Sequence, residues 1–146
     1  MKKATFYLLQ QQKIGEYDAT ISVACDLVAT AWRSGKRVLI SCETEEQALD
    51  IDEVLWARDP EQFVPHNLSG ESTTYATPVE VSWKDKRNTQ RRDLLINLQN
   101  QVPDFISSFN QIIDFVPTEE TQKVEARERY KQLRQMGWQL DTQKIE

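Results

Sequence analysis

Residues 34–47 read Ser-Gly-Lys-Arg-Val-Leu-Ile-Ser-Cys-Glu-Thr-Glu-Glu-Gln, and this stretch decides the fold. Gly35 marks the end of a helix, because glycine readily adopts the left-handed backbone conformation of a helix C-cap. The short apolar run Arg37–Cys42 predicts a buried strand. Thr44 and Gln47 then have the spacing of a capping box, which predicts the start of another helix. A buried strand between two helices, joined by such short loops, indicates an α/β fold.

The sequence upstream continues this alternation of strands and helices. Ala4–Leu9 is a short apolar run and predicts a first buried strand. Apolar residues at helical spacing predict a helix from Tyr17 to Arg33, with Asp18 as its N-cap. The helix that begins after Thr44 is predicted to run to about Arg58. The order strand, helix, strand, helix predicts parallel strand pairing with right-handed crossovers.

The sequence downstream adds further strands and a long last helix. Val79–Trp83 alternates apolar and polar residues, and Gln111–Val116 has a strand pattern. Asp93–Leu98 suits either a strand or a helix by pattern alone. Thr118 is the predicted N-cap of a helix that Gly137 ends, and the tail beyond it stays unassigned. We therefore predict one α/β domain over residues 1–146, with a mostly parallel twisted sheet flanked by helices on both faces.

Composition and charge exclude several classes of protein. The chain has 146 residues, is 39% hydrophobic and 28% charged, and carries a formal net charge of −5. This composition is typical of a globular protein, and the negative balance argues against binding nucleic acid by bulk electrostatics. The first apolar run is too short for a membrane span or a signal peptide. Cys25 and Cys42 stand alone, which is typical of reduced, buried thiols in a cytoplasmic protein.

Each candidate enzyme motif lacks a required part. Gly35-Lys36 follows a helix and precedes a strand, whereas a phosphate loop connects a strand to a helix; the predicted Rossmann-like topology thus has no nucleotide site. His66 is the only histidine, and no GxSxG motif accompanies it. Cysteine and histidine clusters and EF-hand spacing are absent from the sequence, so we expect no metal and no cofactor. These residues indicate an interaction protein, with a small hydrolase or nucleotide-binding protein as the enzymatic alternative.

Positive charge gathers near the C-terminal end of the chain. Residues 123–134 carry five basic and two acidic residues, a local net charge of +3. At about 100° per residue, four basic side chains fall within an arc of about 80°: Lys123, Arg127, Lys131 and Arg134. Tyr130 lies at one edge of this arc. A basic ridge beside aromatic and apolar side chains suits a short acidic peptide with a terminal carboxylate. A solvated helix face has the same pattern.

Two further features leave alternatives open. The run Lys84–Arg92 contains five basic residues and one acidic residue, which is typical of a solvated loop. Together with residues 123–134 it also suits a direct nucleic-acid-binding module. Trp56 and Phe63 flank a predicted helix exit, where large aromatic residues either close the core or anchor a protein interface.

Six blocks of the sequence are similar, in order and spacing, to one known family. The blocks are Ala4–Leu9, Trp32–Ile40, Leu55–Arg58, Phe63–Leu68, Asp114–Pro117 and Ala126–Lys131. Over almost the whole chain they closely resemble the chi-subunit family of bacterial DNA polymerase III holoenzyme. Members of this family have an α/β fold like that of nucleotide-binding domains and have no nucleotide activity.

The resemblance implies a non-catalytic adaptor of the replication machinery. It implies one partner in the psi subunit, which attaches to the clamp loader, and another in the acidic, Phe-ended tail of single-stranded DNA-binding protein. Lys123, Arg127, Tyr130 and Lys131 match the family's tail-binding positions, with Arg127 expected to contact the terminal carboxylate. Trp56 and Phe63 match positions at or near the psi-facing surface. Some members also engage an XPD-type repair helicase.

Overall fold

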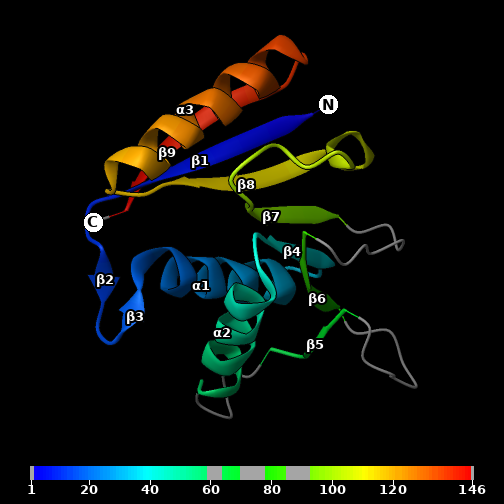
Figure 1. The fold of residues 1–146 in the computed structure, drawn as a ribbon. Helices are drawn as coiled ribbons and strands as arrows, with labels where there is room; N and C mark the ends of the chain where they lie inside the picture. The colour runs from blue at the N-terminus through cyan, green and yellow to red at the C-terminus, as the bar shows by residue number, and fades with distance from the viewer. Residues whose placement is uncertain (1, 59–63, 70–77, 85–92, 146) are drawn as a thin grey trace.

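The central element is a seven-stranded parallel sheet (Figure 1). The computed structural model describes residues 2–58, 64–69, 78–84 and 93–145. In order across the sheet, the strands are β5 (His66–Leu68), β6 (Val79–Trp83), β4 (Val38–Cys42), β7 (Leu94–Leu98), β8 (Gln111–Val116), β1 (Lys3–Leu9) and β9 (Gln139–Ile145). Every residue of β4 and β7 is buried, which explains their mostly apolar sequences.

Helices cover both faces of the sheet, as predicted. On one face lie α1 (Ala19–Arg33) and α2 (Glu45–Trp56), and on the other lies α3 (Glu120–Gln135) (Figure 1). The larger core cluster joins α1 and α2 to the sheet through residues such as Val28, Ile51 and Ile96. A smaller cluster joins α3 to the sheet through residues such as Phe6 and Leu133. The fold class predicted from the sequence is therefore confirmed.

The helix ends follow the sequence signals, with one exception. The side chain of Asp18 accepts the backbone N–H groups of Thr20 and Ile21 at the start of α1. Gly35 and Gly137 follow α1 and α3 with φ angles of 88° and 91°, a conformation that disfavours any residue with a Cβ atom.

The predicted N-cap of the last helix, Thr118, is wrong by one residue. Glu119 caps α3, because its carboxylate accepts the backbone N–H groups of Thr121 and Gln122 at 3.0 and 2.8 Å. A carboxylate reaches two N–H groups at once and also interacts favourably with the positive end of the helix dipole.

Four regions differ from the predictions or extend them. A two-stranded hairpin, β2 (Lys13–Ile14) and β3 (Tyr17–Asp18), precedes α1, so Tyr17 lies in a strand and not in the helix. The ambiguous segment Asp93–Leu98 forms β7, whose position between β4 and β8 buries both of its faces. The unassigned tail forms β9, which pairs with β1. A short 3₁₀ helix (Ile106–Ser108) lies between β7 and β8.

Candidate peptide-binding groove

A groove of about 680 Å³ lies between α3 and the strands beneath it. Its apolar lining comes from Phe6 and Leu8 of β1, Val116 of β8, and Val124 and Ala126 of α3. The side chain of Val124 is 53% exposed, which is high for a branched apolar residue on a helix. An apolar groove that remains open to solvent is a typical docking site for an apolar side chain of another molecule.

Tyr130 forms the aromatic part of this groove. Its ring packs edge-to-face against Phe6, with ring centroids 5.3 Å apart. Phe6 itself is fully buried, so one side of the Tyr130 ring is fixed against the core. The partly buried tyrosine therefore presents a rigid surface to the groove, which lowers the entropy lost when a ligand binds.

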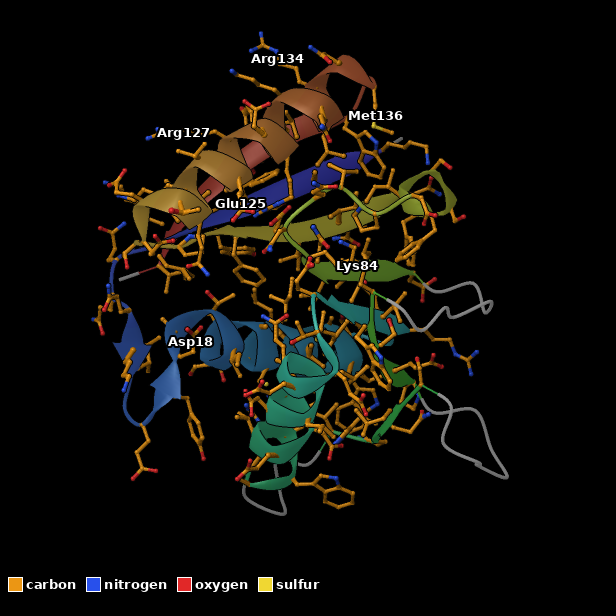
Figure 2. All side chains as sticks on the ribbon, in the orientation of Figure 1. Asp18, Lys84, Glu125, Arg127, Arg134 and Met136 are labelled. Carbon is orange, nitrogen blue, oxygen red and sulfur yellow. The ribbon has the colours of Figure 1, made fainter. Side chains whose placement is uncertain are left out.

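Basic side chains of α3 form the rim of the groove. Four of them line it: Lys123, Arg127, Lys131 and Arg134. Figure 2 shows Arg127 and Arg134 on the outer side of α3, directed away from the sheet. Lys123 and Lys131 lie 3.7 and 3.6 Å from the carboxylates of Glu120 and Glu128, so acidic neighbours partly balance them.

Arg127 differs from the two lysines. Within residues 2–58, 64–69, 78–84 and 93–145, it is exposed and makes no ion pair or hydrogen bond. Its guanidinium can therefore bind a carboxylate through two parallel hydrogen bonds without losing an existing partner. The structure thus places Lys123, Arg127, Tyr130 and Lys131 along one groove. Arg134, which helical spacing predicted in the same basic arc, lines this groove as well.

Arg129 does not belong to this rim, although it is one of the five basic residues in segment 123–134. Its Nε and Nη2 atoms donate to the two carboxylate oxygens of Asp114 at 2.9 and 3.0 Å. It also donates to the backbone carbonyls of Asn100 and Phe115. Both members of the ion pair are buried, so the positive charge of Arg129 is neutralised inside the protein.

The ion pair fixes α3 on the sheet. Burial raises the pKa of Asp114, whereas the Arg129 guanidinium, the Phe115 N–H and the Asn97 amide oppose that rise by donating to the carboxylate. These bonds connect α3 to β8 and to the residues that follow β7. Because Arg129 immediately precedes Tyr130, the ion pair anchors α3 beside a residue that lines the groove.

Trp56 marks a second surface, on the opposite side of the molecule. It ends α2 and is 61% exposed, although its ring packs edge-to-face on His66 with centroids 5.3 Å apart. His66 is buried, with Nδ1 2.7 Å from the Val64 carbonyl and Nε2 3.0 Å from Asp52. Phe63, the other residue predicted for this surface, lies outside the described residues.

A cleft of about 340 Å³ lies at the carboxyl ends of β4, β7 and β8, where α/β folds commonly bind nucleotides. Six carboxylates line it: Asp18, Glu43, Glu46, Asp50, Asp114 and Glu125. Arg129 is the one basic residue among the described lining residues, and Asp114 already neutralises it. A phosphate group in this cleft would face mostly negative charge.

The described ranges contain no cluster of metal-ligating side chains. No group of three histidine, cysteine or carboxylate side chains in those ranges has the arrangement of a metal site. Cys25 and Cys42 are free and buried, as predicted.

No described helix is long and apolar enough to cross a membrane. In the basic run, Lys84 lies 3.5 Å from Glu43, and residues 85–92 lie outside the described ranges.

Sequence comparisons identify the family. The family model described as DNA polymerase III chi subunit, HolC, matches residues 1–141. A DNA polymerase III subunit chi of Haemophilus influenzae is 60% identical over 147 residues, which cover 99% of this chain and 98% of that protein. The subunit chi of Escherichia coli K12 is 50% identical, with 97% of each chain covered, and that of Pseudomonas aeruginosa is 30% identical, with 99% and 98% covered. The chain therefore belongs to the DNA polymerase III chi subunit family.

Proposed function

We propose that this chain is a non-catalytic adaptor of the replicative DNA polymerase III holoenzyme. Membership of the chi family makes it an accessory subunit of DNA replication, with partners in the holoenzyme. The proposed finer function is to connect the psi subunit of the clamp loader with the acidic C-terminal tail of single-stranded DNA-binding protein. Replication takes place in the cytoplasm of bacteria, which is the proposed location.

The observation that carries the proposal is the groove beside α3, which combines an apolar floor with a cationic rim. The tail of single-stranded DNA-binding protein ends in a phenylalanine and carries acidic residues. Its terminal ring fits the apolar floor of the groove near Phe6 and Tyr130. Its terminal carboxylate can pair with the exposed guanidinium of Arg127. Lys123 and Lys131 attract the preceding acidic residues, and because both side chains reach solvent, salt weakens that attraction.

The psi subunit is assigned to the Trp56 surface. Exposed tryptophan is enriched among residues that dominate protein interfaces, and Trp56 is held from one side by His66. Trp56 ends α2, which covers the sheet face opposite α3 (Figure 1). Two ligands on opposite faces bind without competing, which is the requirement for an adaptor. An XPD-type helicase is a second candidate for the Trp56 surface.

The mechanism is tethering. A weak contact with the tail combined with a contact to psi raises the local concentration of the polymerase machinery on coated single strands. Six carboxylates line the described part of the cleft, and its one arginine is already paired with Asp114, so a bound phosphate would meet mostly negative charge. This lining supports an adaptor without catalysis.

Simultaneous binding tests the proposal. The chain is mixed with purified psi and a labelled tail peptide, and the complexes are separated by size-exclusion chromatography. We expect the label to elute with a complex that contains both proteins. Release of the peptide when psi binds would show that the two ligands share one surface and would contradict the adaptor arrangement.

A further inference from the structure

The outer face of α2 carries two exposed apolar residues in one line. Leu49 is 48% exposed and Trp56 is 61% exposed. They are seven residues apart, so they lie about 20° apart around the helix and about 10 Å apart along its axis. Among the other apolar residues of α2, Ala48, Ile51 and Leu55 are buried and Val54 is half-buried. Leu49 therefore extends the Trp56 surface along two turns of the helix.

Acidic side chains border this line on both sides. At about 100° per residue, Glu45 lies about 40° to one side of Leu49, and Glu53 lies about 40° to the other. The helix carries five acidic residues and no lysine or arginine: Glu45, Glu46, Asp50, Asp52 and Glu53. The exposed face of α2 is thus an apolar line between two acidic borders.

Four of the five carboxylates are available to a partner. Asp52 accepts a hydrogen bond from His66. In the ranges that the structure describes, the other four make no ion pair, and the nearby cation Arg58 is already paired with Asp26 at 3.0 Å. Like charges this close together repel one another, so a ligand that brings positive charge relieves the repulsion.

We propose that the face formed by Glu45, Leu49, Glu53 and Trp56 binds a basic amphipathic helix of the partner protein. This inference rests on the proposed function, in which Trp56 belongs to the psi-facing surface. Apolar residues two turns apart match the spacing of a helix that packs along α2, and lysine or arginine residues at its edges match the acidic borders. A second copy of this chain does not fit, because two α2 helices would place acidic borders opposite each other.

The affinity of psi for variants of the chain tests this inference. Leu49→Ala is expected to weaken binding by about tenfold, because it removes apolar contact at the centre of the interface. Glu45→Lys/Glu53→Lys is expected to weaken binding by about tenfold at low salt and to approach the native affinity at high salt, where charges are screened. All of these residues are exposed, so circular dichroism is expected to show an unchanged fold.

Two matched controls test whether loss of any exposed apolar side chain, or any equal change of net charge, has the same effect on psi binding. Met136→Ala removes an apolar side chain of similar exposure, 51%, from the end of α3. Glu16→Lys/Glu128→Lys changes the net charge by the same amount at exposed positions outside α2. Neither control is expected to change the affinity for psi by more than about twofold at moderate salt, because the changed side chains lie outside the α2 face.

Trp56→Ala distinguishes failure of the inference from failure of the proposed function. Weaker binding by Trp56→Ala, with native affinity in the Leu49 and charge-reversal variants, would overturn the inference and leave psi assigned to the Trp56 surface. Tighter binding by the charge-reversal variant at low salt would overturn the basic character of the partner helix. Native affinity in all three variants would overturn both assignments.

Discussion

Arg129 of α3 and Asp114 of β8 form a bidentate ion pair in which the two side chains are 8% and 2% exposed. The pair lies beneath the same helix whose outer side carries Arg127. One arginine thus holds the helix on the sheet, while another, two residues earlier, is left available to a ligand.

Loss of Asp114 is expected to destabilise the fold strongly. Asp114→Ala leaves the Arg129 guanidinium buried without its counter-charge, which typically costs about 3–5 kcal/mol in the free energy of unfolding. Urea denaturation measures this change. Arg127→Ala serves as the control, since loss of an exposed arginine with no ion pair to any described residue is expected to change stability by less than about 0.5 kcal/mol. Equal stability of the two variants would contradict the role given to the ion pair.

The cap of α3 is expected to make stability depend on acidity. Hydrogen bonds from Gln122 and Thr121 lower the pKa of Glu119. A carboxyl with a lowered pKa in the folded state stabilises the protein above its ordinary pKa, and this contribution is lost as the pH falls through the lowered value. Glu119→Gln is therefore expected to reduce the melting temperature at neutral pH and to weaken its decline in acid. A larger effect of Thr118→Ala would identify Thr118 as the cap instead.

The two cysteines are expected to be unreactive in the folded protein. Burial raises the pKa of Cys25 to about 12 and raises that of Cys42 even further above its ordinary value. The reactive thiolate is therefore scarce at neutral pH. Ellman's reagent is expected to react slowly with the native chain. In denaturant, where both thiols are exposed, it is expected to react with two thiols per chain. Rapid reaction of either thiol before unfolding would contradict their burial.

Direct binding of single-stranded DNA is expected to be weak. The chain has a net charge of −5, and Arg129 is neutralised inside the fold rather than displayed on α3. Anisotropy of a labelled oligonucleotide is expected to show no binding at physiological salt. Tight binding with a steep salt dependence would instead support the nucleic-acid-binding module formed by residues 84–92 and 123–134.

The sequence predicted the helices and strands that are marked by a capping residue or by a regular spacing of apolar residues. Thr44 caps α2 as the capping box indicated, by accepting the N–H of Gln47, although the Gln47 side chain bonds to the N–H of Glu43 and not to that of Thr44. Strand β9 was not predicted, because an exposed edge strand can be polar on both faces. Its sequence, Gln-Leu-Asp-Thr-Gln-Lys-Ile, carries little apolar alternation.

The lining of the candidate groove was predictable only where a helix supplies a spacing signal. Helical spacing placed Lys123, Arg127 and Lys131 on one side of α3, but β9, whose Thr142 lines the groove, had no signal. Arg129 could have been separated from the rim, since it lies three residues after Ala126 and four before Leu133, both of which are buried. A lone acidic residue such as Asp114 in an apolar strand indicates a buried partner of opposite charge.

Binding of the tail peptide tests the central claim most directly. A labelled acidic peptide that ends in Asp-Phe with a free carboxylate is titrated with the native chain and with Arg127→Ala, and anisotropy is recorded. Arg33→Ala, which removes an exposed arginine from the end of α1, is the matched control. A peptide with an amidated C-terminus isolates the contribution of the terminal carboxylate.

We expect the native chain and Arg33→Ala to bind alike, with affinity that falls as salt rises. Arg127→Ala is expected to bind at least about tenfold more weakly, and amidation of the peptide is expected to weaken native binding similarly. Native affinity in Arg127→Ala, or no binding by the well-folded native chain, would contradict the groove beside α3 as the tail-binding site.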